Sequence, residues 1–321
     1  MNVASAQGRR WLMLIAVAAI AGYLAVAIGM ESQRLGQGLA RLGLGGITLV
    51  LGLSLLNYGL RCWRWAVYLQ RLGHRLPVLR HAGYYFGGFA FTVSPGKAGE
   101  ALRGVYLRQH GVPWSHTLAA LFTERLLDVL AICALIALTT GQLEHWRGLG
   151  LAIGACVLLL VWLLGRPGLP DALDRLSHRL LPRLAHAMKA LSSLLRASAQ
   201  LLSLSQLLPA LLLGMLAWGA EGYGLYWLAQ SLGLDLSVQA GIAIYSIGVL
   251  AGALTFFMPG GLGGVEAAMT ALLVAAGSDV ASAFVITVLC RFATLWLAVL
   301  LGLAALLWLE WRLLATVRSQ P

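Results

Sequence analysis

Long apolar stretches alternate with short polar ones along almost the whole chain of 321 residues. About 20 apolar residues are enough to cross a bilayer as an α-helix. The pattern predicts six spanning helices, at residues 11–30, 42–60, 117–138, 149–164, 208–229 and 281–309. Arg9 and Arg10 before the first stretch resemble the start of a signal peptide, but the apolar region of a signal peptide has only about 7–15 residues. We therefore expect the first stretch to be a retained span.

Two further apolar segments are too short or too interrupted to be ordinary spans. We predict that residues 82–109 and 238–277 form re-entrant hairpins, because proline removes a backbone donor and glycine permits a chain reversal. Irregular backbone at membrane depth persists only where protein buries it or where it lines a wet cavity. The alternative is a pair of ordinary helices kinked at proline. The predicted hairpin turns are at Pro95, Gly96 and Gly99, and at Pro259, Gly260, Gly261 and Gly263.

Composition supports a lipid environment, since 60% of the residues are hydrophobic and 11% are charged, against about 25% charged in soluble domains. Lys and Arg outnumber Asp and Glu by 23 to 12 and concentrate at residues 61–80 and 166–196. The positive-inside rule places these loops and both termini in the cytoplasm, in a bacterial inner membrane. No basic stripe with interleaved aromatic residues indicates nucleic-acid binding. The four cysteines form no C-x-x-C pair, so we expect neither a metal site nor a disulfide framework.

The order of segments predicts an all-α polytopic membrane protein with two inverted-topology repeats, each with three spanning helices and one re-entrant hairpin. Three spans per half would insert the second half upside down. The first repeat is assigned to residues 1–165 and the second to residues 149–309, and the span at 149–164 counts as the first span of the second repeat. An amphipathic cytoplasmic linker occupies residues 166–205, and residues 310–321 form a cytoplasmic tail. We predict that the linker forms one helix on the membrane surface, or two helices divided near Pro182. A regulatory or lipid-sensing role is the alternative to a simple connection.

Charges inside the apolar segments are the candidate substrate-binding residues, because a charge at the centre of a membrane helix costs about 2.5–3.5 kcal/mol. Glu100 lies 25 residues before Arg125, and Glu266 lies 25 residues before Arg291. Broken helices at corresponding positions of inverted halves point to a transporter's binding site. The guanidinium fork suits phosphate oxygens. The alternative is a closed network of structural salt bridges. The set is Lys97, Glu100, Arg103, Glu124, Arg125, Asp128, Glu266 and Arg291.

Two other groups of polar residues have two interpretations each. Glu221, near Tyr223 and Tyr226, is a candidate proton carrier or a protonated acid bonded to a tyrosine. Asn57, Arg61 and Arg64 end the second span, where arginines either extend toward the interface or collect lipid headgroups at the cytoplasmic mouth. The chain has no G-x-x-x-x-G-K-[ST], G-x-S-x-G or H-E-x-x-H motif, so we expect no ATP hydrolysis, no catalytic residues and no cofactor.

Four segments, SPGKAGEALRGVYL, LFTERLLDVLA, FFMPGGLGGVEAAM and LCRFATLWLAVLLG, resemble the transmembrane region of the lysyl-phosphatidylglycerol synthase/flippase family, over roughly residues 10–310. The resemblance implies a lipid flippase fold, which in bifunctional members moves aminoacylated phosphatidylglycerol between leaflets. The soluble aminoacyl-transfer domain of those members has no counterpart before Pro321, so we expect no lipid aminoacylation by this chain. The family's motif positions here are Pro95, Gly96, Gly99, Glu100, Glu124, Arg125, Asp128, Pro259, Gly260, Gly263, Glu266 and Arg291.

The sequence thus favours a flippase for an anionic lipid, whether an aminoacyl-phospholipid, a polyprenyl-phosphate-linked sugar or another envelope lipid. Membrane lipids are the expected partners, together with a lipid-modifying synthase or a glycosyltransferase. One alternative is an integral-membrane enzyme that acts on a lipid-linked substrate, with Glu124 and Asp128 as acid and base. The other is a non-catalytic partner of a lipid synthase.

Overall fold

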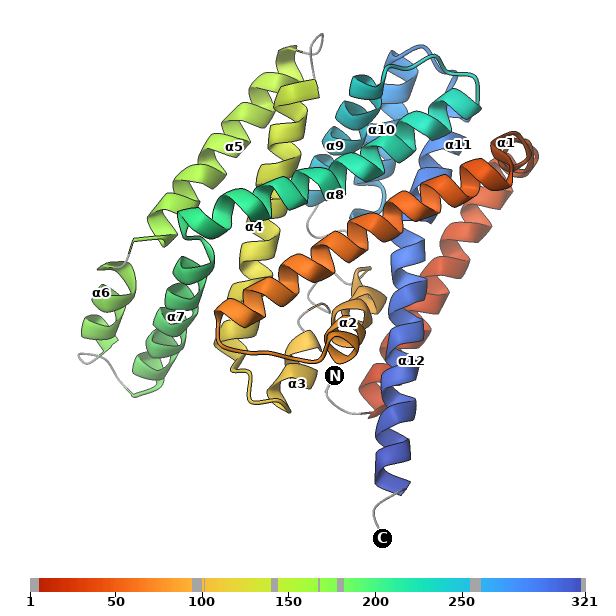
Figure 1. Ribbon diagram of the computed structural model, residues 1–321. Coiled ribbons are helices and arrows are strands. Elements are labelled where there is room, and N and C mark those ends of the chain that lie inside the picture. The colour runs from red at the N-terminus through yellow and green to blue at the C-terminus, as the bar shows by residue number, and fades with distance from the viewer. Residues whose placement is uncertain are drawn as a thin grey trace.

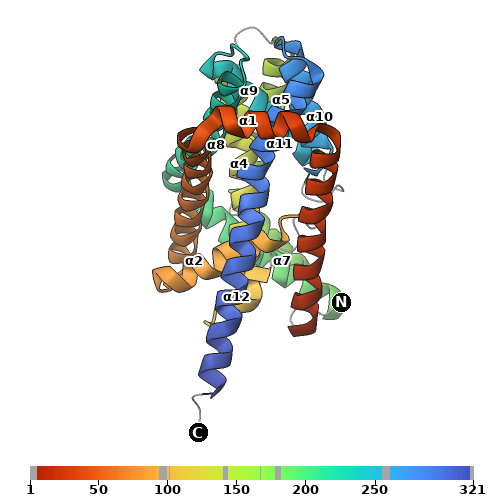
Figure 2. The ribbon, with the colours of Figure 1, turned by 90° about the vertical axis from the view of Figure 1, so that its right-hand side faces the viewer.

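The computed structural model describes residues 6–93, 100, 102–139, 144–166, 168–177, 182–254 and 261–318. Within these ranges the chain is entirely helical apart from turns. Helix α1 begins and helix α12 ends at the same end of the molecule, which we call the termini side (Figures 1 and 2). The elements are α1 (Ala6–Arg71), α2 (Val78–Gly87), η1 (Gly88–Phe91), α3 (Arg103–Arg108), α4 (Trp114–Thr139), α5 (Glu144–Leu164), α6 (Gly168–Ser177), α7 (Pro182–Leu201), α8 (Leu204–Ser231), α9 (Val238–Leu254), α10 (Gly264–Ala275), α11 (Val280–Arg291), η4 (Phe292–Trp296) and α12 (Leu297–Arg318).

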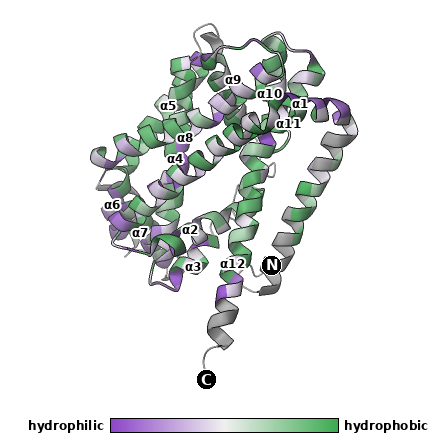
Figure 3. Cartoon of the chain, turned by 45° about the vertical axis from the view of Figure 1, so that its right-hand side comes forward, coloured by the Kyte–Doolittle hydropathy of each residue, from purple (hydrophilic) through white to green (hydrophobic). Residues whose placement is uncertain are grey.

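Each of the six predicted spans is helical. Four helices of the described chain are long and apolar enough to cross a membrane: Glu31–Arg71, Arg147–Leu164, Leu204–Ser231 and Val280–Arg312. The span predicted at 117–138 lies within α4, whose 26 residues include three charged side chains. The span predicted at 11–30 is the first limb of α1. Hydrophilic residues gather at the bend of α1 and around α6 and α7 (Figure 3).

Helix α1 bends twice, so that its first and last limbs both run between the termini side and the opposite side (Figures 1 and 2). The bends are at Glu31 and at Gly43, where φ is +59°, a conformation that glycine adopts without a Cβ clash. The segment between them, which separates the first two predicted spans, is helical as well. Arg34 in this segment lies 2.9 Å from the carboxylate of Asp279, the N-cap of α11, and so ties the two elements together.

The segments predicted as hairpins form short helices. Residues 82–109 contain most of α2, then η1 and α3, while residues 238–277 contain α9 and α10, which pack against each other. Gly261 and Gly263 have positive φ values of +68° and +86°, which agrees with their prediction as turn residues. The other predicted turn residues and the candidate lysine lie outside the described residues, namely Pro95, Gly96, Lys97, Gly99, Pro259 and Gly260.

Helices from opposite halves of the chain interlock. Helix α2 and turn η1 pack on α12, and α9 packs on α4. The first contact depends on small residues, as is common between membrane helices. A Cβ on Gly83 would lie 2.7 Å from Cζ3 of Trp308, and a Cβ on Gly302 would overlap the backbone of Ala90.

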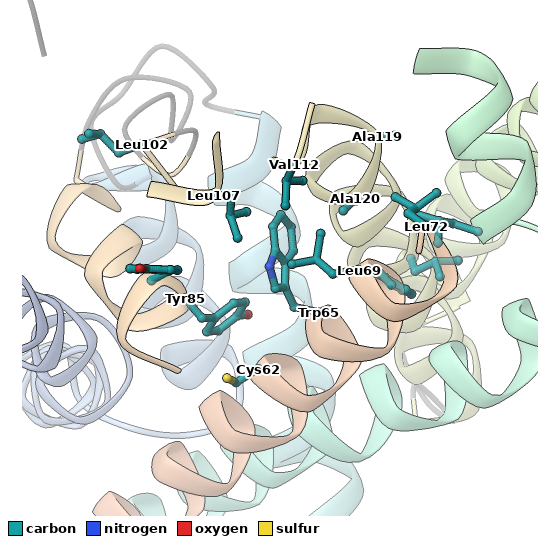
Figure 4. Packing of buried hydrophobic residues seen from close by; sticks show 14 of the residues in the cluster. Cys62, Trp65, Leu69, Leu72, Tyr85, Leu102, Leu107, Val112, Ala119 and Ala120 are labelled. Carbon is teal, nitrogen blue, oxygen red and sulfur yellow. The ribbon is translucent and has the colours of Figure 1, made fainter. Parts of the chain in front are cut away.

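A hydrophobic cluster joins α1, α2, α3 and the start of α4. Figure 4 shows Trp65 of α1 at its centre, with Leu107 and Val112 close to the indole. The ring centroids of Trp65 and Tyr85 are 6.1 Å apart. This packing fixes α2 and the last limb of α1 relative to α4, and therefore positions the polar side chains that these elements carry.

The predicted linker consists of two helices, α6 and α7, which pack side by side, and α7 begins at Pro182. Arg196 of α7 pairs with Asp171 at 2.8 Å and with Asp174 at 2.6 Å, both in α6. Exposed leucines, among them Leu176, Leu184 and Leu191, leave an apolar surface on the pair. Helix α12 continues to Arg318, so the predicted tail is helical over residues 310–318.

We predict that Gly302→Ala destabilises the protein by about 1–3 kcal/mol, because the new methyl group has to displace backbone at Ala90. Thermal unfolding of the purified protein in detergent measures the change. The control is Gly59→Ala in α1, where a Cβ meets no atom within 4 Å, and where alanine stabilises a helix by up to about 1 kcal/mol. Equal unfolding temperatures for the two variants would show that the α12–η1 contact is not tight.

Candidate functional site

Two carboxylates on α4 form the centre of the site. Glu124 and Asp128 lie one helical turn apart and are 0% and 3% exposed. Helix α4 packs against α1, α7, α8 and α9, so both side chains are enclosed on several sides. Buried carboxylates need charged or hydrogen-bonding partners, because an uncompensated charge is very unfavourable in a low-dielectric interior.

Arginines from two other elements and a tyrosine surround Glu124. The Arg103 guanidinium Nη1 lies 3.2 Å from Oε2, and the Arg61 Nη2 lies 3.4 Å from Oε1. The hydroxyl of Tyr85 donates a hydrogen bond of 2.7 Å to Oε1. The Arg103 guanidinium also lies 4.1 Å from the ring centroid of Tyr85 and 4.9 Å from that of Trp65, a cation–π arrangement. The hydrophobic cluster therefore holds the arginine that neutralises Glu124.

Asp128 and Glu100 extend the same network. Asp128 accepts a short hydrogen bond from Arg64, and its Oδ2 lies 3.2 Å from Arg61 and 3.5 Å from Arg125. Glu100 Oε2 lies 3.2 Å from Arg125 Nη2 and 3.4 Å from Arg103 Nη2. We call these seven residues the ion cluster: Arg61, Arg64, Arg103, Arg125, Glu100, Glu124 and Asp128.

The ion cluster has more positive than negative charge, with four guanidinium groups and three carboxylates. The Nε donor of each of its four arginines is buried and has no hydrogen-bond partner among the described residues. Each guanidinium has five N–H donors and no acceptor. The three carboxylates therefore do not satisfy the donors of the ion cluster, a composition that suits an additional anion.

A second ion pair lies in the later half of the chain. Arg291 Nε, at the end of α11, is 2.8 Å from Glu266 Oε1. The other oxygen of Glu266 accepts a hydrogen bond of 2.7 Å from the backbone N–H of Gly263, so this carboxylate also caps α10. Both glutamates therefore pair with the arginine 25 residues later in the chain.

The π-helical turn η4 follows Arg291 directly. A π-helical turn leaves backbone carbonyls without their usual helical partners, and such turns are frequent at functional sites. Here the hydroxyl of Tyr58 lies 2.7 Å from the carbonyl oxygen of Thr294 and 3.2 Å from that of Ala293. Tyr58 thus connects α1 to the point where α11 continues into α12.

A cavity of about 340 Å³ lies between these two groups of charges. Its polar lining comes from both: Arg61, Glu100, Arg125, Asp128 and Arg291, with Tyr58, Glu221 and Tyr245. Apolar side chains form much of the remaining wall, including Val129, Ile132, Val249, Val265, Leu295 and Ala298. One space therefore combines three guanidinium groups with an apolar surface.

Glu221 lies in α8, is 3% exposed and accepts a short hydrogen bond from the Tyr245 hydroxyl of α9. The sequence interpretation had a bonded tyrosine as one possibility, but named Tyr223 and Tyr226, which are neighbours on the same helix. The partner instead comes from the helix packed against α8. No pattern within the sequence singled out Tyr245, Tyr58 or Tyr85, because their roles depend on which helices meet.

The positions of the Arg61 and Arg64 side chains differ from the sequence prediction that they extend toward the membrane interface. Arg64 is 1% exposed and Arg61 7% exposed, so neither extends toward the interface. Both guanidinium groups point into the ion cluster, and only Arg61 also lines the cavity. Asn57 donates to the backbone oxygen of Ala217 at 2.9 Å and joins α1 to α8. Lys97 lies outside the described residues.

Fold and site together define a multi-pass all-α membrane protein whose buried ion cluster faces a partly apolar cavity. Residues 13–302 match the family described as the lysylphosphatidylglycerol synthase TM region, and the chain belongs to that family. The UPF0104 membrane protein PH1989 of Pyrococcus horikoshii is 22% identical over 273 residues, which cover 74% of this chain and 79% of the relative. The family predicted from the four sequence segments is confirmed.

We predict that Glu124→Gln destabilises the protein more than Arg61→Gln does. Loss of the Glu124 carboxylate increases the net positive charge of the ion cluster and removes one carboxylate partner of Arg103. Breaking a buried ion pair costs about 3–5 kcal/mol of folding stability. Loss of Arg61 removes the excess, so its effect is expected to be smaller. Thermal unfolding in detergent compares the two variants.

The control for this comparison is Asp171→Asn, which removes one exposed partner of Arg196 and should leave the unfolding temperature unchanged. A larger loss for Arg61→Gln than for Glu124→Gln would contradict the proposed charge excess.

Proposed function

We propose that this protein moves an anionic lipid between the leaflets of a bacterial inner membrane, with both termini in the cytoplasm. The observation that carries the proposal is the cavity, in which Arg61, Arg125 and Arg291 share one space with an apolar wall. Lipids with a phosphate headgroup have this combination of a charged end and an apolar body. Basic residues at 71–80 and 166–196 support the orientation.

The arginines bind the phosphate, and the carboxylates hold them when the site is empty. Glu100 and Glu266 pair with Arg125 and Arg291 at 3.2 Å and 2.8 Å, so each arginine has an anionic partner before the lipid arrives. Phosphate oxygens accept two parallel hydrogen bonds from a guanidinium and can replace a carboxylate there. When the lipid phosphate replaces the glutamate carboxylate, the arginine keeps an anionic partner and is never unpaired in the apolar interior.

Only the headgroup enters the cavity. A volume of about 340 Å³ is at the lower end of the range for small-molecule sites and is too small for a lipid with its acyl chains. The tails therefore remain in the bilayer beside the protein. The apolar wall, including Val129 and Leu295, accommodates the first methylene groups.

Movement follows from two inverted repeats whose hairpins are re-entrant. Three observations support this arrangement: the equal spacing of the two Glu–Arg pairs, the packing of each hairpin on a helix from the other half, and the short lengths of α9 and α10. Transporters of this design alternate access by moving one repeat against the other around a fixed site. The π-helical turn beside Arg291 gives α12 a point at which to move.

The family name refers to lysylphosphatidylglycerol, so an aminoacyl-phospholipid is a further cargo to test: it has the same phosphate, although its ammonium groups offset the negative charge. A polyprenyl-phosphate-linked sugar and other envelope lipids have the same phosphate chemistry. An enzyme with Glu124 as its acid or base is less well supported, because that carboxylate is fully buried among guanidinium groups. A lipid synthase or glycosyltransferase would supply or consume the cargo as a partner.

We predict that purified protein in liposomes transfers fluorescent anionic phospholipid from the inner to the outer leaflet, and that Arg125→Ala and Arg291→Ala each reduce the initial rate at least tenfold. Both substitutions remove a guanidinium that lines the cavity. Reduction of outer-leaflet fluorophores by dithionite measures the accessible fraction.

The matched controls are Arg34→Ala and Arg196→Ala, which remove exposed arginines far from the cavity and should keep the wild-type rate. A chemically altered lipid after incubation would instead support an enzyme. Neither transfer nor modification, with a folded protein, would favour a non-catalytic partner of a synthase.

Glu221 is the proton carrier in this proposal. If it is ionised, the cavity lining has three guanidinium groups and three carboxylates, whereas its protonation leaves one net positive charge for an anionic headgroup. Groups around it on the neighbouring helices are Tyr58 and Arg61 of α1, Asp128 of α4, Tyr245 of α9, and Cys290 and Arg291 of α11.

We therefore predict that a pH gradient across the liposome membrane changes the transfer rate of the wild type, and that Glu221→Gln removes this dependence while transfer continues. Glutamine resembles the protonated acid in shape and in lack of charge. The same dithionite assay, with an imposed gradient and with the gradient collapsed by an ionophore, measures the effect. Unchanged gradient dependence in Glu221→Gln would assign the proton to another group.

A further inference from the structure

A second pocket, of about 210 Å³, lies on the termini side where α2, α3 and α12 meet. None of its lining residues lines the cavity described above. On α12 different stretches line the two spaces, since Ala298 of the cavity and Trp308 of the pocket are 10 residues apart, or about 15 Å along the helix axis. The pocket is therefore a separate feature of the surface.

The pocket is positively charged. Arg80 of α2 and Arg312 of α12 line it from two sides, and no Asp or Glu is among its lining residues. The Arg312 guanidinium lies 4.4 Å from the ring centroid of Trp308, which holds it at the rim. Two guanidinium groups brought together from different helices, without a carboxylate in the lining, favour binding of an anion.

Stacked aromatic rings form part of the pocket lining. The rings of Tyr84 and Tyr106 stack with their centroids 5.3 Å apart and an interplanar angle of 7°, and both residues are buried. The hydroxyl of Tyr84 and Nε2 of His110 form a hydrogen bond of 2.9 Å. Gln109 adds an amide to the lining. The arginines therefore face a preformed surface with further polar groups.

The residues around the pocket indicate that it opens at a lipid surface. Val78 and Leu79, immediately before Arg80, are 85% and 61% exposed, and Trp311, immediately before Arg312, is 66% exposed. Exposed apolar and tryptophan side chains beside arginines are typical of the membrane interface, where lipid phosphates lie. A pocket for a soluble anion has no need of such neighbours.

We propose that this pocket binds the phosphate of an anionic lipid at the termini-side interface, where it collects the cargo before the headgroup enters the cavity. The pocket is a binding site in its own right, while its role in collecting cargo rests on the proposed function. Arg80 and Arg312 bind the phosphate oxygens, and Gln109 and His110 contact the remainder of the headgroup.

The test uses the full-length protein in detergent and a double variant, R80Q/R312Q. Calorimetric titration with dihexanoyl-phosphatidylglycerol, a soluble short-chain lipid, measures binding directly. The wild type should bind this lipid, and the double variant should lose at least tenfold in affinity at one site. The control, R34Q/R196Q, removes two exposed arginines elsewhere and should bind as the wild type does. Unfolding temperatures verify that both variants fold.

A titration with inorganic phosphate distinguishes the source of the anion. Weak or absent binding of free phosphate, together with the lipid result above, supports a lipid site. Free phosphate that binds as tightly as the lipid would overturn the lipid assignment. Equal affinities of R80Q/R312Q and R34Q/R196Q for the lipid would overturn the site itself. These measurements do not depend on lipid transfer, so the pocket and the proposed function can fail separately.

In liposomes the double variant should require a several-fold higher mole fraction of anionic lipid for half-maximal transfer, while the maximal rate stays the same. This result separates collection of the lipid from its passage, because variants of the cavity arginines reduce the maximal rate. A reduced maximal rate at saturating lipid in R80Q/R312Q would contradict the collecting role.

Discussion

Neutralisation of Glu124 and Asp128 in the interior of the protein is the constraint on which the rest of the structure depends. Carboxylates in an apolar helix are tolerated only when cations reach them. Arg61 and Arg64 reach them from α1, Arg103 from α3 and Arg125 from α4 itself. The last limb of α1, the α2–α3 region and α4 must therefore meet at one place, and the hydrophobic cluster around Trp65 and Tyr85 keeps them there.

The same constraint connects the stability of the fold with what the cavity can bind. Equal numbers of carboxylates and guanidinium groups would balance the charge of the ion cluster. With four guanidinium groups and three carboxylates, some N–H donors have no partner in the part of the chain that the structure describes, and the cavity with its apolar walls lies beside the ion cluster. The Glu266–Arg291 pair brings a further guanidinium to the same space from the later half of the chain. Stability alone does not account for this excess of donors, which is why we propose that the cavity binds an anionic headgroup.

Much of the helical fold was predictable, because each predicted span is a largely apolar run that can be recognised without knowledge of its neighbours. The equal spacing of Glu100 and Arg125 and of Glu266 and Arg291 placed matching residues in matching segments, and both pairs are formed, although Arg125 also contacts Asp128. Arg61 and Arg64 were harder to interpret. Arginines at the end of an apolar run usually extend toward the interface, and only the crossing of α1 with α4 turns them inward. Tyr245 was missed because nothing near it in sequence indicates contact with Glu221.

The sequence by itself determined that the chain is a helical membrane protein and that several charged residues lie within its apolar segments, because hydrophobicity and the energetic penalty of a charge in lipid act on each segment separately. Tertiary structure alone decided which arginine meets which carboxylate, how Tyr58 and Tyr245 take part, and that both groups of charges face one cavity. These outcomes depend on contacts between helices far apart in the chain, such as the approach of Gly302 to Ala90, and no local pattern encodes them.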